Sequence, residues 1–377
     1  MLTGGLRWLG RFATARSRII PAVFVLLAAA AIPGLLQIEI NDNPVNWFKS
    51  GSEIRVAVEE LNELFPGTFN ATWLLEGNEP GALTDPEVVR TVAALQQFWQ
   101  EIGVIGQTTS YVDLVPRDGP EAVLPDSRED IELALDEAAN SPQGNFVGGL
   151  ITPDRQKAAV QVLLKDGDNQ AMQRVVDRTD SFLESSPLPV ETRAEWAGET
   201  YLNLVWQDKM VSGMMKAFGS TFIVILVLAL LLFRSLRWAI LAVLPLTVTI
   251  LLLYGGVGFI GRDYDMPLAV LSTLALGIAV DFAIHFIQRY RELLRETKAS
   301  GKALIGVFEE PARAISRNAL IIAAGFIPMF FTSLVPYIVV GALMAIIMIS
   351  SWLVSLVLLP ALIALFQRKS EAAASEA

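Results

Sequence analysis

The chain has 377 residues, 53% of them hydrophobic, and a formal net charge of −10. It is too apolar for an average soluble domain and yet strongly acidic, which indicates a division of labour along the chain. With no cysteine there is no disulfide framework or thiolate site, and one histidine cannot build a His-rich metal centre. The acidic surplus argues against nucleic-acid binding.

The charged residues are unevenly distributed. Residues 39–209 hold 30 of the 39 acids but only 12 of the 29 bases, whereas residues 210–366 consist mainly of long apolar runs. This pattern predicts an acidic soluble domain attached to a membrane domain.

The apolar runs predict six membrane spans, because crossing roughly 30 Å of hydrocarbon takes about 20 apolar helical residues. The first span is 19–38, between a basic segment 1–18 and an extracytoplasmic domain 39–210. Five more spans form a membrane domain, 211–366, which is followed by a tail, 367–377. These spans are expected at 214–233, 238–260, 267–287, 318–335 and 338–366.

The flanking charges predict the orientation of the spans. Fifteen Lys and Arg residues lie on one side, against a single one, Arg262, in the short loops opposite. By the positive-inside rule both termini are then cytoplasmic and the large domain is external. The first span could instead be a cleaved secretory signal, but its apolar run is longer than the usual signal core, so we expect a retained anchor.

The external domain has alternating strand and helix patterns. A Ser-x-x-Glu capping box at Ser50 and Glu53 is expected to open a first helix that ends before Pro66. Strand-like runs are then expected at 68–77, 108–115, 158–167 and 189–198, and helices at 85–102, 126–139, 169–183 and 199–216. Strands that alternate with helices predict a compact α+β domain built from β-α-β units with a split β-α-β sheet. The last helix would run directly into the second span.

No motif in the sequence predicts catalysis. The Gly301-Lys302 pair lacks the first glycine of an ATP-binding loop, because Glu296 stands at that position. We therefore predict a protein that is not an enzyme, with no cofactor, no metal and no ATP site.

One span carries two ionisable groups, in the stretch GIAVDFAIHF from Gly277 to Phe286. Asp281 is predicted to lie within a turn of the midplane, where a carboxylate costs a few kcal/mol at least. An acid that is neutral when sealed in lipid and charged when wetted meets the physical requirement for a proton carrier. His285 follows at i+4 and Arg289 at i+8, so the three residues form one stripe that could be a proton path.

Gly277 lies one turn before Asp281 and would allow another helix to come close. A purely structural interpretation stays open, in which Asp281 and His285 only hold the bundle together and Arg289 anchors the helix end. Five polar residues of neighbouring spans are candidate partners, although each could equally be bonded to its own backbone: Thr247, Thr249, Asn318, Ser350 and Ser351.

Three motifs carry a family resemblance. FRSLRWAILAVLP, YGGVGFIG and ALGIAVDFAIHFIQRYRE, together with two close-spaced final spans, resemble the resistance-nodulation-division superfamily, particularly its MMPL and hopanoid-transporter branches. The resemblance covers nearly the whole chain. It implies a porter-like external domain, transport driven by proton influx, and Asp281 as the proton-relay acid, with His285 as a further candidate.

The chain departs from this family in having one six-span repeat where most members have two. We expect a homodimer, since two-fold symmetry is the commonest closed assembly. A second polypeptide could instead supply the other half, or the chain could be a fragment of a longer one.

The leading functional hypothesis is a proton-coupled exporter of a lipid or other hydrophobic molecule in a bacterial inner membrane. The alternatives are a non-transporting lipid or sterol sensor and a Sec-type protein-translocation accessory subunit. An intramembrane aspartyl protease is disfavoured, because such enzymes need two membrane aspartates and Asp281 is the only acid within the predicted spans.

Overall fold

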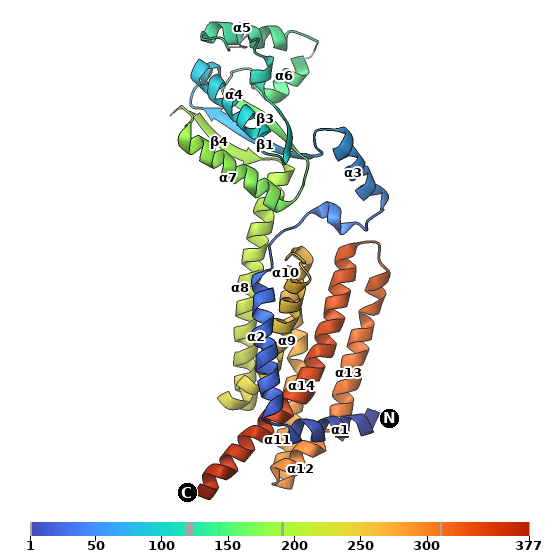
Figure 1. Ribbon diagram of the computed structural model, residues 1–377. Helices are drawn as coiled ribbons and strands as arrows, with labels where there is room; N and C mark the ends of the chain where they lie inside the picture. The colour runs from blue at the N-terminus through green and yellow to red at the C-terminus, as the bar shows by residue number, and fades with distance from the viewer. Residues whose placement is uncertain (1, 118–123, 143, 190–191, 310, 377) are drawn as a thin grey trace. The chain divides into compact units, whose positions relative to one another are not determined.

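The chain folds as two compact units in a computed structural model that describes residues 2–117, 124–142, 144–189, 192–309 and 311–376. Residues 1–40 and 210–377 form a helical membrane unit, and residues 41–209 form a second unit, which we call the external unit after its expected position (Figure 1). The sequence places this division at 39–210. Each unit has a hydrophobic core of its own.

The described part of the membrane unit is entirely helical apart from short connections. Its helices are α1 (Leu2–Ala15), α2 (Ile19–Leu36), α8 (Glu199–Phe233), α9 (Leu236–Phe259), α10 (Met266–Ala279), α11 (Asp281–Thr297), α12 (Ser300–Val307), α13 (Pro311–Gly325), the 3₁₀ turn η4 (Ile327–Phe331) and α14 (Val335–Glu376). Within the described residues, six helical segments are long and apolar enough to cross a membrane, as the sequence predicts.

Two spans differ in detail from the sequence prediction. The span expected at 267–287 comprises α10 and α11, which are interrupted at Val280. The span expected at 318–335 begins earlier, at Pro311, and its α-helix ends at Gly325. Pro328 lacks a backbone N–H and therefore cannot continue the α-helical ladder, so the chain passes through η4 before α14 begins.

The expected basic segment 1–18 is largely a helix. α1 packs against α12, α13 and α14, and its Leu6 is buried. Arg7 forms an ion pair with Glu309 at 3.1 Å. Because residues 7–18, the turn from α8 to the start of α9, and residues 289–317 carry most of the Lys and Arg residues of this unit, we call this end of the membrane unit the basic end (Figure 1).

The closest helix contact in the membrane unit joins α2 to α9 through glycines. A Cβ atom added at Gly255 would lie 2.5 Å from the carbonyl oxygen of Ala31, and one at Gly258 would lie 1.7 Å from that of Gly34. The two backbones therefore meet without side chains between them, a common form of helix packing in membranes. The glycine-rich run YGGVGFIG serves this contact.

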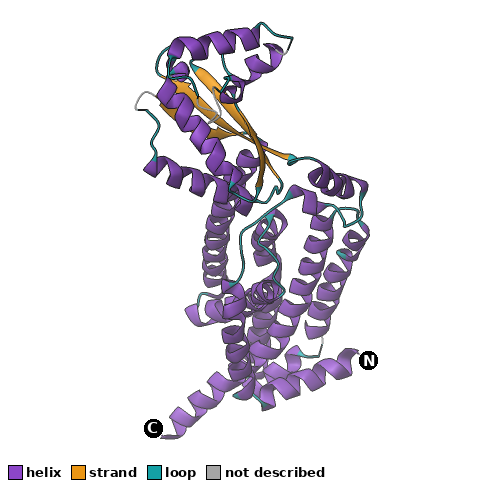
Figure 2. Cartoon of the chain, turned by 45° about the horizontal axis from the view of Figure 1, so that its top comes forward, coloured by secondary structure: helices purple, strands orange, loops and turns teal. Residues whose placement is uncertain are grey.

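The external unit is built on a four-stranded sheet with the order β2-β3-β1-β4 (Figure 2). Its strands are β1 (Phe69–Gly77), β2 (Ile105–Thr109), β3 (Lys157–Leu164) and β4 (Thr192–Ala197), and every neighbouring pair is antiparallel. β1 and β2 are thus parallel to each other with β3 between them, and α4 (Pro86–Gln100) connects them. β3 and β4 are related in the same way around β1, through α7 (Asn169–Ser185). The predicted split β-α-β sheet is confirmed, in a ferredoxin-like arrangement.

Strand alternation explains the core of the external unit. Ala71, Trp73 and Leu75 of β1 are buried, and Trp73 meets Trp99 of α4 edge to face, with ring centroids 5.5 Å apart. The Trp99 Nε1–H donates to the Thr179 hydroxyl of α7 at 2.8 Å. The remaining elements are η1 (Pro44–Trp47), α3 (Glu53–Leu64), η2 (Ala82–Thr84), η3 (Tyr111–Leu114), α5 (Arg128–Ala139) and α6 (Gly144–Leu150).

Two local predictions for this unit are wrong. α3 starts after Ser52, not at a Ser50–Glu53 capping box, and Ser52 makes no capping hydrogen bond. The run expected as a strand at 108–115 leaves the sheet after Thr109, because a capping box at Ser110 and Asp113 starts η3. The side chains of Ser110 and Asp113 accept hydrogen bonds from the backbone N–H groups of Val112 and Ser110, so these N–H groups do not continue the sheet.

We predict that Gly255→Ala lowers the stability of the chain by about 1–3 kcal/mol, because the added methyl overpacks the α2–α9 contact. Gly256→Ala is the matched control, since no neighbouring heavy atom lies within 4 Å of its added Cβ. Thermal unfolding of the purified chain in mild detergent measures both. Equal melting temperatures for the two variants would contradict this account of the contact.

Candidate functional site

Asp281 stands at the junction of α10 and α11, in the middle of a candidate span. It is the sixteenth of the 32 residues from Met266 to Thr297. Val280, the single residue between the two helices, keeps right-handed helical dihedrals (φ −72°, ψ −23°). The two helices are therefore separated by a break in the regular backbone hydrogen bonds and not by an extended residue. Asp281 is therefore in the first turn of α11, where the helix dipole favours a negative charge.

The interruption of the ladder is stabilised from α14. The N–H of Ala283 donates to the carbonyl of Val280 at 3.1 Å, a shorter-range bond than an α-helix makes. The buried hydroxyl of Ser351 donates to the carbonyl of Ala279 at 2.6 Å. Ser351 was expected as a candidate polar partner of Asp281. Its hydroxyl instead bonds the backbone of Ala279, two residues before Asp281. No glycine or proline marks this junction, so the sequence offered no signal for it.

Four residues form a stripe along α10 and α11, which we call the Asp281 stripe: Leu274, Gly277, Asp281 and His285. The spacing of 3, 4 and 4 residues places them on one helical face. His285 Nε2 lies 3.2 Å from an Asp281 carboxylate oxygen, so the structure brings these two predicted residues together. The side chains of Asp281 and His285 are 46% and 60% exposed in the single chain, and Leu274 is also exposed.

Gly277 was expected to let another helix come close. In the structure it is exposed, and no neighbouring heavy atom of the described residues lies within 4 Å of a Cβ added there. The expected close approach of another helix is therefore not seen among the described residues of this chain.

A cavity of about 420 Å³ opens beside His285 toward the basic end. His285 and Arg289 line it from α11, and Pro311, Ile315 and Asn318 are among the residues that line it from α13. Arg289, which lies in the middle of α11, donates to the carboxylate of Glu292 at 2.7 Å. Asn318, expected as a candidate polar partner, thus faces the same cavity as His285.

The other expected polar partners do not reach the acid. The Thr247 hydroxyl bonds the carbonyl of Val243 in its own helix at 3.1 Å. The buried hydroxyl of Thr249 has no hydrogen-bond partner among the described residues. Ser350 is partly buried and has no described hydrogen bond either. The pair Asp281–His285 is therefore held by α11 itself and not by a network of neighbouring helices.

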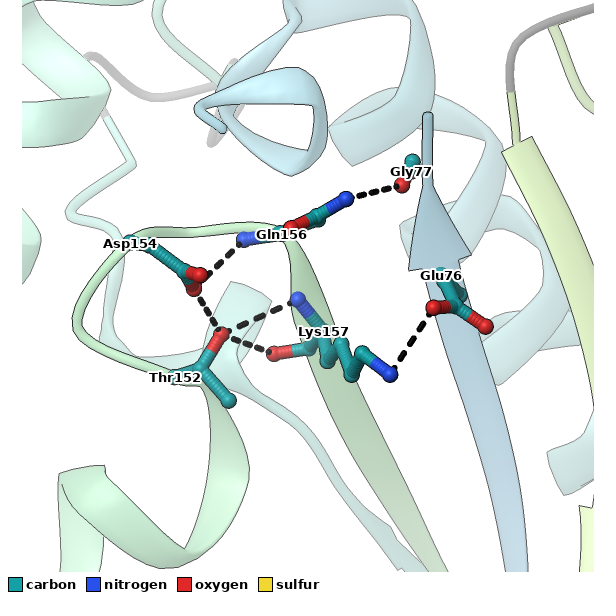
Figure 3. Close-up of polar contacts among 6 residues, drawn as sticks. All are labelled: Glu76, Gly77, Thr152, Asp154, Gln156 and Lys157. Carbon is teal, nitrogen blue, oxygen red and sulfur yellow. Dashed lines mark hydrogen bonds and ion pairs between the residues drawn. The ribbon is translucent and has the colours of Figure 1, made fainter. Parts of the chain in front are cut away.

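The external unit has a concavity of its own, of about 330 Å³, on the sheet face away from α4 and α7. Its charged lining residues are two bases, Lys157 and Arg193, and two acids, Glu76 and Glu195. Lys157 pairs with Glu76 across β3 and β1 at 2.8 Å (Figure 3). The Lys157 ammonium lowers the pKa of the Glu76 carboxyl, so the pair contributes stability at neutral pH that is lost on acidification. Gln156 further ties the start of β3 to the carbonyl of Gly77 at 3.1 Å. These contacts tie the start of β3 to the end of β1.

Among the described residues no group of three or more His, Cys, Asp or Glu side chains is arranged to hold a metal ion. The ionisable groups that the stripe brings together are the Asp281 carboxylate and the His285 imidazole.

Comparison with known proteins gives one family. The sequence profile of the MMPL family matches residues 46–376. A Methanocaldococcus jannaschii protein named as a membrane protein is 22% identical over 289 residues, which cover 76% of this chain and 73% of that protein. The Mycobacterium tuberculosis proteins MmpL5, named as a siderophore exporter, and MmpL9, named as a transport protein, are each 26% identical over 58% of this chain. The matches cover 23% and 24% of their lengths.

Replacing Ser351 by Ala should destabilise the chain by about 1 kcal/mol, because the carbonyl of Ala279 loses its hydroxyl donor in a buried place. Ser350→Ala is the neighbouring control, since Ser350 has no hydrogen bond among the described residues. The readout is the thermal midpoint in detergent. A Ser351→Ala midpoint no lower than that of Ser350→Ala would show that the bond does not stabilise the junction.

Proposed function

Since this chain belongs to the MMPL family of the resistance-nodulation-division superfamily, we propose that it is a proton-coupled membrane transporter. Its substrate would be a lipid or another hydrophobic molecule that leaves the inner membrane. The observation that carries the proposal is a carboxylate in mid-span, within 3.2 Å of a histidine, on a stripe that the chain leaves uncovered. Ionisable groups inside a span are expensive, which favours a functional reason for this one.

The proposed mechanism uses two states of the Asp281 stripe. A carboxylate is favoured where water reaches it, and the neutral acid is favoured where lipid or protein seals it. A conformation that seals the stripe therefore binds a proton, and one that wets it releases the proton, so a proton gradient biases the two conformations. The cavity beside His285 and Arg289 offers a wet route from the stripe toward the basic end. His285 would be the next proton carrier on this route.

The uncovered Asp281 stripe also suggests that a second chain packs against it. A single chain would present the half-exposed Asp281 carboxylate and the exposed Gly277 to the apolar membrane interior, where an unpaired charge costs several kcal/mol. A second copy related by a two-fold axis would cover both, and the missing side chain of Gly277 would allow close packing. We therefore propose a homodimer in which the two Asp281 stripes face each other. A different chain carrying a second repeat is the alternative.

The charge distribution supports an orientation for the transporter. The fifteen Lys and Arg residues counted on one side of the predicted spans belong to segments of the basic end or to segments that adjoin them. By the positive-inside rule this end would be cytoplasmic, and the external unit would lie outside the inner membrane. The helix α8, from Glu199 to Phe233, contributes residues to both units. Neither the sensor nor the translocation accessory hypothesis is favoured by an observation of its own, and proton movement distinguishes both from a transporter.

Asp281→Asn should reduce proton flux through the reconstituted protein to the rate of protein-free liposomes, because an amide cannot bind and release a proton. An imposed pH gradient and an entrapped pH-sensitive dye measure the flux. His285→Ala should slow the flux or shift its pH optimum. Glu296→Gln, a neutralised acid in the last turn of the same helix, is the control and should keep the wild-type rate. Wild-type flux in Asp281→Asn would refute the assignment.

Gly277→Cys should form a cross-link between two copies in the membrane, because the stripe residues of a homodimer lie across the two-fold axis. The chain contains no cysteine, so the introduced thiol is unique. Ala275→Cys is the control, since Ala275 is 1% exposed and packs inside its own chain. Oxidation or a short bifunctional thiol reagent, followed by non-reducing electrophoresis, reports the product. A chain that shows proton flux but no cross-link at this position would exclude the proposed homodimer.

A further inference from the structure

A groove of about 810 Å³ lies at the basic end of the membrane unit, between α9, α11 and α14. Tyr290 and Leu294 line it from α11, the helix whose His285 and Arg289 line the smaller cavity described above. Tyr290 follows His285 by five residues, which turns it about 140° around the helix from the Asp281 stripe. The groove is therefore separate from the proposed proton path, and its volume is in the range of small-molecule sites.

The groove changes from polar to apolar along its length. Arg237 lies in the first turn of α9, and Leu244, seven residues later, is about 10 Å further along the helix axis. α14 runs in the opposite direction to α9 and has the matching gradient, from Leu362 to Gln367 at the basic end. Polar groups thus lie at the basic end and aliphatic side chains lie deeper. An amphiphile with its head at the membrane surface has the same gradient.

The wall near the polar end is fixed by aromatic contacts. Tyr290 is 1% exposed, its hydroxyl accepts a hydrogen bond from the Gln367 amide, and its ring centroid lies 5.8 Å from that of Trp238. The guanidinium of Arg291 lies 6.0 Å from the Trp238 ring and donates to the carbonyl of Phe233 at 3.1 Å. Trp238 is held between a ring and a cation, so the shape of the groove does not depend on a ligand.

The charge of the groove is unbalanced. Among the residues whose side chains the structure describes, Arg237 is the one charged residue that lines it, and no acidic residue does. Across the described chain Arg237 takes part in no ion pair or hydrogen bond, in contrast to Arg289, which is paired with Glu292. A guanidinium binds phosphate in a bidentate manner and remains charged at any physiological pH. The missing counter-charge points to an anionic ligand.

We propose that this groove binds a membrane lipid with an anionic phosphate headgroup. The phosphate would bind Arg237 at the basic end, and an acyl chain would lie along Leu241, Leu244 and Leu362. The exposed side chains of Ile240 and Phe366 give the groove an apolar rim, so a lipid can enter from the leaflet at this end. The inference goes beyond the proposed transport and does not depend on it, because the site shares no lining residue with the Asp281 stripe.

The test offers the full-length protein in mild detergent an equimolar mixture of phosphatidylglycerol and phosphatidylcholine with the same acyl chains. Native mass spectrometry counts the lipids retained. We expect the wild-type chain to retain phosphatidylglycerol over phosphatidylcholine by about tenfold, and Arg237→Gln to abolish the preference. Arg295→Gln removes an exposed basic residue of the same end that does not line the groove, and should keep the preference. Leu244→Trp fills the apolar part and should lower retention of both lipids.

Three outcomes would overturn the proposal. One is equal retention of the two lipids by the wild-type chain. A second is a loss in Arg295→Gln as large as in Arg237→Gln, which would mean attraction to the whole basic surface. A third is displacement of phosphatidylglycerol by glycerol phosphate, which would mean a site for free anions. Asp281→Asn should keep the lipid preference, so failure of the transport proposal leaves this result unaffected.

Discussion

The carboxylate of Asp281 imposes the constraint on which the rest of the membrane unit depends. It stands in the middle of a 32-residue candidate span, where the described residues of the single chain provide one polar neighbour, His285, and no covering helix. A charge in hydrocarbon is expensive, so the acid needs either water, a proton or a covering partner. Each of these three conditions corresponds to a state that a proton-driven transporter would pass through.

The helices around this acid keep the junction fixed while its outer face remains open. Ser351 bonds the backbone just before Asp281 from the buried side, and the α2–α9 glycine contact packs another part of the unit backbone against backbone. Interactions on the inner side are dense and specific, whereas Gly277 and the two ionisable side chains point outward. This open outer face is the basis of the proposed homodimer. The lipid groove lies on a different side of α11, so the same helix would serve two ligands.

Much of the architecture could be predicted from the sequence, because it follows from local periodicity. Apolar runs gave six spans, and the alternation in β1 and β3 gave strands whose inward residues, such as Trp73 and Val160, are buried. The predictions failed where a few side chains decide the local backbone, as at Ser110 and Asp113, which end β2, and at Pro328, which shortens α13. In these places the segment stays apolar, but the regular backbone hydrogen bonds of the strand or α-helix end.

By itself, the sequence determined that Asp281 and His285 share a helical face, since i and i+4 are neighbours on any α-helix. It also determined the spans and the split sheet, through their periods. Only the tertiary structure decided that this face is uncovered, that Ser351 bonds Ala279, and that Arg237 lies over an apolar groove. These facts depend on how each helix is rotated and paired with segments far away in the chain. Helical periodicity specifies a face, but contacts between distant segments specify what lies against it.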